Sequence, residues 1–271
     1  MSFISRLREI QADRSSVVCV GLDPDPERLP PHLLERFSLP DAVVAFNRSI
    51  IEATQGYACA YKFNLAFYEI LAEDSWRVLE ESLAFVPQNV ITIADGKRGD
   101  IGNSARFYAD ALFSKLEFDA CTVSAYMGRD SVEPFLEYEG HGVFVLVRTS
   151  NPGAADFQEL HVGGERLYEI VARTARTWDD DLPGTIGFVV GGTDPAALRA
   201  VRSMCPEEPL LIPGIGTQGG DAEAVMGAAS DGPLLVNSGR QIIYASNGQD
   251  FAAAAAKETV RLRDLLEQFR G

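Results

Sequence analysis

Two aspartates and a lysine lie close together at the end of an apolar run, in the segment VITIADGKRGDIGNS (90–104). The run ends at Asp95, Gly96 and Lys97, and Asp100 comes just before a helical pattern begins. Because side chains alternate along a strand, Asp95 and Lys97 are expected on the same face. Taken alone, the pattern also fits a surface ion pair followed by an acidic residue at a helix start.

A second lysine favours a chemical role for this cluster. Lys62 lies near the end of the preceding apolar run, in AYKFN (60–64). A lone lysine in that place usually only extends its ammonium group to solvent. If the two runs are neighbouring strands, however, two lysines and two aspartates meet at one rim of the sheet. Fixed cations of this kind stabilise negative charge that develops on a reacting atom.

A phosphate-binding pattern occurs later in the chain. The segments GIGTQGG (214–220) and SGR (238–240) each follow an apolar run. Backbone N–H groups of such loops bind phosphate, and Arg240 can hold it with two parallel hydrogen bonds. Single glycines are ordinary turn residues and do not by themselves indicate a phosphate site. The phosphate-binding interpretation depends on the position of these loops after the last two predicted strands, where barrels commonly bind phosphate.

The positioning elements follow from a repeated pattern of short β-branched runs and longer amphipathic segments. The predicted strands are residues 16–23, 58–64, 90–96, 120–125, 142–150, 185–192, 209–216 and 234–240. Predicted helices include residues 41–54, 75–85, 103–117, 165–178 and 251–269. Eight such units in 271 residues favour a closed (β/α)8 TIM barrel, with residues 1–271 as a single domain, over an open doubly wound sheet.

Two loops rich in proline and glycine follow predicted strands. Residues 23–40 come after the first strand and residues 151–165 after the fifth. Both lie at carboxyl ends of strands, where barrels of this type build their active sites. The extra loop length therefore indicates function at that end of the barrel.

The charge balance limits the classes of partner. The chain has 39 acidic and 24 basic residues, for a formal net charge of −15. Such a surface repels nucleic acid and anionic membranes, yet a few cations in one cleft still attract a small anionic substrate. No apolar leader precedes the charged start, and no apolar stretch reaches about 18 residues, so a cytoplasmic location is expected.

The cysteines and histidines form no recognisable site. The four cysteines lie far apart and most sit in apolar runs, so we expect buried free thiols. The three histidines, His32, His141 and His161, are scattered, and neither a metal triad nor a Ser-His-Asp arrangement can be assembled from them. We therefore predict no metal and no cofactor.

The motifs together resemble those of the orotidine 5'-phosphate decarboxylases over nearly the whole chain. DGKRGDI matches the D-x-K-x-x-D-I motif, and GLD, YKFN, RTSNPGA, PGIGTQGGD and NSGRQI occur in the family's order. The D-x-K-x-x-D motif is shared by a wider superfamily, whereas the five companions together are specific. The chain length and the residues within the motifs are most similar to those of the longer bacterial and mycobacterial subgroup. Arg98 and Gly99 depart from the commonest pattern, which has an apolar residue there.

The resemblance implies that Lys62, Asp95, Lys97 and Asp100 form an alternating charged tetrad, with Asp100 reaching across a homodimer interface into the partner's site. Lys97 is the expected proton donor, because loss of CO2 from C6 of the pyrimidine leaves a carbanion without an adjacent electron sink. Asp95 is expected near the departing carboxylate, while Lys62 and Asp100 hold the array in place.

The resemblance also implies the contacts to the substrate, orotidine 5'-monophosphate. The phosphate is assigned to the loop that contains Gly239 and Arg240, and Gln218 contacts both phosphate and base. Ser150 is expected at the pyrimidine edge. The ribose hydroxyls are assigned to Asp23 and Ser104.

Two alternative functions share parts of this sequence pattern. A metal-dependent sugar-phosphate decarboxylase or aldolase of the same superfamily shares the barrel and the motif, but these relatives carry an acidic residue at the second-strand position. Lys62 occupies it here and repels a cation. A catalytically silent barrel that binds a phosphate ligand is the other alternative. It is disfavoured because clustered ionisable groups are costly to keep without use.

Overall fold

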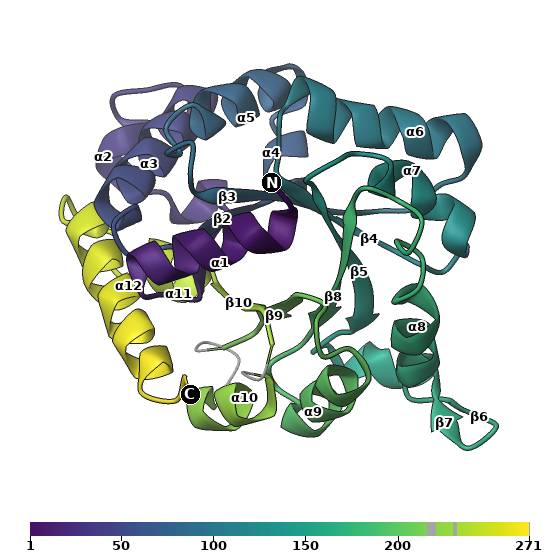
Figure 1. The fold of residues 1–271 in the computed structure, drawn as a ribbon. Helices are drawn as coiled ribbons and strands as arrows, with labels where there is room; N and C mark the ends of the chain where they lie inside the picture. Colours follow the sequence, from purple (N-terminus) through teal and green to yellow (C-terminus); the bar gives the residue numbers. More distant parts are fainter. Residues whose placement is uncertain (216–220, 230–231, 271) are drawn as a thin grey trace.

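The computed structural model describes residues 1–215, 221–229 and 232–270. Eight parallel strands close into a barrel in the order β1-β10-β9-β8-β5-β4-β3-β2, which confirms the predicted TIM barrel (Figure 1). The barrel strands are β1 Val18–Leu22, β2 Ala60–Asn64, β3 Ile91–Arg98, β4 Ala120–Val123, β5 Gly142–Arg148, β8 Thr185–Val190, β9 Leu210–Pro213 and β10 Leu234–Ser238. All eight predicted strands are present, and each end lies within three residues of the predicted one.

Helices surround the barrel on its outside (Figure 1). They are α1 Phe3–Arg14, α2 Pro31–Leu34, α3 Leu39–Thr54, α4 Ala66–Glu69, α5 Ser75–Leu83, α6 Gly102–Asp110, α7 Glu133–Leu136, α8 Leu167–Ala175, α9 Pro195–Met204, α10 Ala222–Ala229, α11 Arg240–Ile243 and α12 Phe251–Glu267. Helix α12 packs against α3 and α10, so the last helix closes the outer ring of helices beside the helix that follows β1.

Helix α1 covers the amino-terminal end of the barrel and is the dark purple helix across its opening in Figure 1. Phe3 packs edge-to-face on Phe144 of β5 with ring centroids 5.9 Å apart. The Gln11 amide donates to the carbonyl of Leu234 at the start of β10 (2.7 Å). With this end closed, the carboxyl ends of the strands form the accessible end of the barrel.

A glycine makes room for one large core residue. Phe144 is fully buried and pairs in register with Gly187 of β8. A Cβ atom at Gly187 would lie 2.8 Å from the Phe144 ring and 2.7 Å from the carbonyl oxygen of Pro209. Only glycine therefore fits here without displacing the neighbouring backbone.

The loop after β5 differs from the sequence expectation. Within residues 151–165 we predicted irregular structure, but β6 His161–Val162 and β7 Glu165–Arg166 pair as a short antiparallel hairpin. Gly163 and Gly164 form its turn with φ of 63° and 93°. Two consecutive residues of positive φ suit a tight hairpin turn, which is why a glycine pair stands there.

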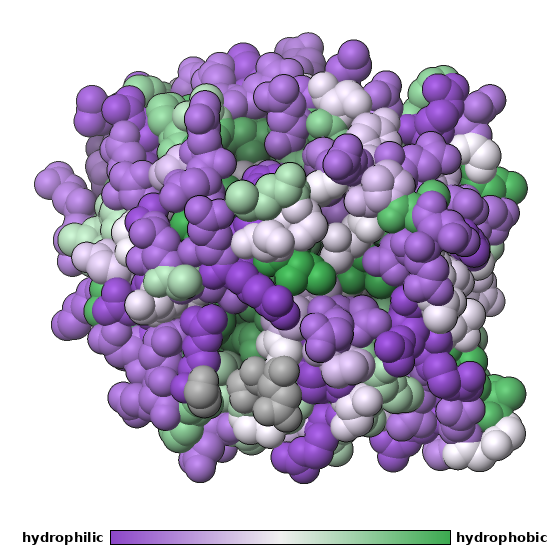
Figure 2. All heavy atoms as spheres, viewed as in Figure 1, coloured by the Kyte–Doolittle hydropathy of each residue, from purple (hydrophilic) through white to green (hydrophobic). Residues whose placement is uncertain are grey.

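The surface agrees with the charged composition. Hydrophilic residues cover most of the face shown in Figure 2. The four cysteines are buried and free, as predicted. Across the part of the chain that the structure describes, no helix combines the length and apolar character needed to span a bilayer.

Candidate active site

The carboxyl end of β3 is irregular, and this irregularity places the charged residues. Ala94 pairs with Cys121 of β4, and the next pair is Arg98 with Val123. Lys97 has a φ of 45°, which is unusual for a residue with a Cβ atom. Strained backbone of this kind is often found at active sites.

Three charged side chains from β2 and β3 meet as the sequence predicted. The ammonium group of Lys62 lies 2.9 Å from Oδ2 of Asp95, and that of Lys97 lies 2.7 Å from Oδ1. Lys62 also faces Asp23 at the end of β1, at 3.6 Å. The carboxylate of Asp95 is thus held between two cations. The Lys62–Asp95 pair is buried, with side chains 5% and 10% exposed, whereas the Lys97 side chain is 44% exposed.

The buried pair is fully ionised at neutral pH. Burial pushes the pKa of Lys62 down, but the negative charges of Asp23 and Asp95 outweigh it and the pKa is raised. Burial likewise pushes the pKa of Asp95 up, but Lys62 and Lys97 outweigh it and the pKa is lowered. A charge array of this type is fixed before substrate arrives, which is what electrostatic catalysis requires.

The array forms one wall of a cavity of about 190 Å³ at the carboxyl end of the barrel. Asp23, Ser150, Gly239 and Arg240, all assigned to substrate contact from the sequence, line the same cavity. A Cβ atom at Gly239 would lie 3.0 Å from Asp23, so a larger residue would press on that carboxylate. Gln218 lies outside the described residues.

Arg240 is exposed at the start of α11. Among the described residues it has no carboxylate partner within ion-pair distance, unlike the paired arginines elsewhere on the surface. Its guanidinium group is therefore available for an anion at the rim of the cavity.

Two polar side chains of this cavity, Thr122 and Asn237, received no role from the sequence. The Oδ1 atoms of Asn237 and Asp23 are buried, and among the described residues no group donates a hydrogen bond to either. Buried acceptors of this kind need donors, and ligand hydroxyl groups can supply them. Both residues sit in predicted strands, but only the alternation of inward-facing positions could have indicated them.

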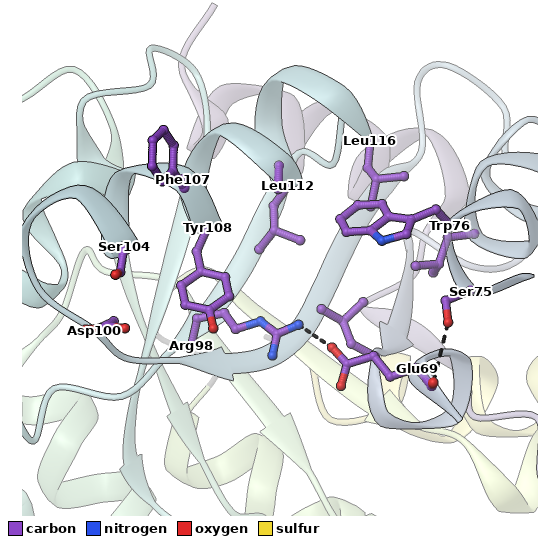
Figure 3. A pocket seen from close by; sticks show the side chains of 13 residues that line it. Glu69, Ser75, Trp76, Arg98, Asp100, Ser104, Phe107, Tyr108, Leu112 and Leu116 are labelled. Atoms are coloured by element: carbon purple, nitrogen blue, oxygen red, sulfur yellow. Dashed lines mark hydrogen bonds and ion pairs between the residues drawn. The ribbon is translucent and has the colours of Figure 1, made fainter. Parts of the chain in front are cut away.

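Asp100 and Ser104 lie elsewhere in this chain. Both line a separate cavity of about 480 Å³. In Figure 3 they lie together near the start of α6. The Asp100 carboxylate accepts a hydrogen bond from the Ile101 N–H (2.8 Å) and, among the described residues, makes no ion pair with Lys62 or Lys97. One chain therefore assembles three members of the predicted tetrad but not the fourth.

Arg98 shapes the loop that carries Asp100. Its guanidinium pairs with Glu69 after β2 and stacks 5.0 Å from the centre of the Tyr108 ring on α6 (Figure 3). These contacts tie the loop to two helices. Arg98 thus anchors the loop between β3 and α6.

The described residues contain no group of three or more histidine, cysteine or acidic side chains suited to hold a metal ion. His141 packs on Phe113 with ring centroids 4.5 Å apart, and His32 packs near Phe251 at 6.0 Å. His161 lies on the exposed hairpin. The three histidines are as scattered as the sequence suggested.

The fold and the site define a TIM-barrel protein with a preformed array of fixed charges in a cavity at the carboxyl ends of its strands. Residues 16–256 match the model of the Orotidine 5'-phosphate decarboxylase / HUMPS family. The chain belongs to this family.

Individual relatives match over their full length. A curated orotidine 5'-phosphate decarboxylase from Haloarcula marismortui is 47% identical over 284 residues, and one from Azoarcus sp. is 46% identical over 275 residues; each alignment covers both chains completely. The solved structure of Leishmania donovani OMP decarboxylase is 37% identical, with a TM-score of 0.82, and the match covers 97% of this chain and 99% of that one.

Proposed function

We propose that this chain converts orotidine 5'-monophosphate to uridine 5'-monophosphate and CO2, as a carbon–carbon lyase of pyrimidine nucleotide biosynthesis in the cytoplasm. The observation that carries the proposal is the Lys62–Asp95–Lys97 array in the cavity. The names of the full-length relatives support the same reaction. Lys62 at the second strand argues against the metal-dependent alternative, because an ammonium group repels a divalent cation.

The reaction breaks the bond between C6 and the carboxylate, and the electron pair stays on C6. Lys97 stabilises this carbanion by its charge and then transfers a proton from Nζ to C6. Asp95 faces the departing carboxylate, and two such charges about 4 Å apart repel by about 4 kcal/mol at an effective dielectric of about 20. CO2 is neutral, so its departure relieves this repulsion.

Turnover is expected to survive metal removal, because the lysine cations supply the charge stabilisation that a metal ion or an electron-sink cofactor supplies in other decarboxylases. The assay follows the loss of orotidylate absorbance with purified protein after dialysis against EDTA. Activity that disappears with EDTA and returns with Mg²⁺ would contradict the proposal. Binding of orotidylate without turnover would instead favour the silent barrel.

Substrate recognition is assigned to the rest of the cavity. Arg240 and the backbone at Gly239 bind the phosphate, Asp23 binds a ribose hydroxyl, and Ser150 reads the pyrimidine edge. The buried acceptor of Asp23 and the exposed guanidinium of Arg240 support these assignments. We assign Gln218 to the phosphate and the base from the sequence motif alone.

Replacing Arg240 by alanine is expected to lower kcat/KM by about 100-fold, mainly through KM, since charge-assisted hydrogen bonds contribute about 1.5–3 kcal/mol each. Part of the loss should fall on kcat, because remote binding energy is partly expressed in the transition state. Steady-state kinetics test this, with Arg199→Ala as control at an exposed arginine of α9 outside the cavity. Equal kinetics for both variants would remove Arg240 from the site.

We also propose a homodimer in which Asp100 and Ser104 complete the partner's site. Their separation from Lys97 in this chain supports a role in another chain. Large apolar side chains that line the same cavity are exposed, with Phe107 60% and Trp76 51% accessible. A second copy that covers this face buries those side chains and brings Asp100 to the partner's lysines.

A further inference from the structure

Thr122 lies opposite the irregular part of β3. Because Ala94 pairs with Cys121 and Arg98 with Val123, residues 95–97 of β3 face a single residue of β4, which is Thr122. The ordinary ladder of backbone hydrogen bonds cannot continue through such a bulge. The N–H of Lys97 therefore needs another acceptor.

The Thr122 hydroxyl supplies that acceptor and also binds Asp95. The Lys97 N–H donates to Oγ1 of Thr122 (2.9 Å), and Oγ1 donates to Oδ1 of Asp95 (2.8 Å). An ionised carboxylate can only accept, so the direction of both hydrogen bonds is fixed. Thr122 is 1% exposed, which shields both bonds from competition by water.

We propose that Thr122 is a positioning residue for decarboxylation, which holds the Asp95 carboxylate and the Lys97 backbone in one fixed geometry. The inference rests on the roles proposed above for these two residues. Oδ1 of Asp95 accepts from both the Thr122 hydroxyl and the Lys97 ammonium group. Without the hydroxyl, the carboxylate is held only by the two lysines and can turn with the Lys97 side chain.

Lys97 depends on this support more than Lys62 does. Its side chain is 44% exposed, against 5% for Lys62, and Asp95 is its one ion-pair partner among the described residues. The position of its ammonium group thus follows from the backbone at Lys97 and from Asp95, and Thr122 binds both. A displacement of about 1 Å in a catalytic group can lower the rate by about 100-fold.

The other end of the barrel offers a matched control. Thr92 of β3 is buried, and its hydroxyl donates to Oδ2 of Asp119 (2.9 Å) and accepts from the Asp119 N–H (3.1 Å). It thus makes the same two kinds of hydrogen bond as Thr122. Asp119 pairs with Arg6 of α1, at the closed end of the barrel. The Thr92→Val variant therefore measures what such a hydroxyl contributes to stability alone, away from the cavity.

The experiment compares Thr122→Val, Thr122→Ser, Thr122→Ala and Thr92→Val in the full chain. Measurements are kcat and KM for orotidylate, the dissociation constant for uridylate, and the melting temperature. We expect Thr122→Val to lower kcat by about 10- to 100-fold with KM and uridylate binding changed by less than about 3-fold. Thr122→Ser, which keeps the hydroxyl, should stay within about 3-fold of the parent kcat.

Thr92→Val should lower the melting temperature but leave kcat within about 2-fold of the parent value. An unchanged kcat in Thr122→Val overturns the inference. So does an equal loss of kcat in Thr122→Ser and Thr122→Ala, which differ only in the hydroxyl and decide the question even if Thr122→Val fails to fold. A Lys97→Ala variant assayed alongside distinguishes failure of the Thr122 inference from failure of the proposed function. If Lys97→Ala kept full activity, the proton-donor role would be refuted whatever the threonine variants do.

Discussion

Replacing Lys97 by alanine is expected to abolish decarboxylation while leaving the fold intact. General acid catalysis contributes about 10²–10⁴-fold to a rate, and removal of one fixed group that stabilises developing charge costs about 10²–10³-fold. Since Lys97 is proposed to do both, kcat should fall by at least about 10⁴-fold. The side chain is 44% exposed, and Asp95 keeps Lys62 as a buried partner, so stability should change little.

The measurement needs protein free of any parent enzyme, because a trace of contamination sets the lower limit of a loss this large. Expression in a host without its own orotidylate decarboxylase meets this need. Circular dichroism, thermal melting and uridylate binding check that the variant is folded and that its cavity is intact. Turnover close to that of the parent chain would refute the role of Lys97 as proton donor.

The barrel could be predicted from the sequence because its signal is local. Each strand is a short run of β-branched and apolar residues, and each loop after it contains turn residues. The hairpin after β5 was missed, since His161–Val162 and Glu165–Arg166 are too short and too polar to show a strand period. Two-residue strands are defined by the turn between them rather than by burial.

The charged array was predicted by alternation along β3, but the structure holds it in a different way. A bulge opposite Thr122 and a positive φ at Lys97 interrupt the regular strand between Asp95 and Arg98. A bulge depends on the register with the neighbouring strand, which tertiary packing sets. No pattern in the sequence around Lys97 could therefore reveal the bulge or the Thr122 hydroxyl that bridges it.

Mixing two inactive variants, Lys97→Ala and Asp100→Ala, is expected to restore activity once their subunits exchange. If each site takes Lys97 from one chain and Asp100 from its partner, a hybrid dimer has one site with both lesions and one site with neither. Random pairing makes about half of the dimers hybrid, each with one of two sites intact, so recovery should approach roughly one quarter of the parent activity.

A second mixture provides the control that isolates the shared site. Asp95 and Lys97 belong to the same array within one chain, with 2.7 Å between them. A mixture of Asp95→Asn and Lys97→Ala leaves one lesion in each site of every hybrid, so it should stay inactive under the same exchange conditions. Subunit exchange itself is verified by mass spectrometry of differently tagged chains. Verified exchange without recovery in the first mixture would mean that Asp100 acts within its own chain, and recovery in both mixtures would mean that the assay responds to something other than a rebuilt site.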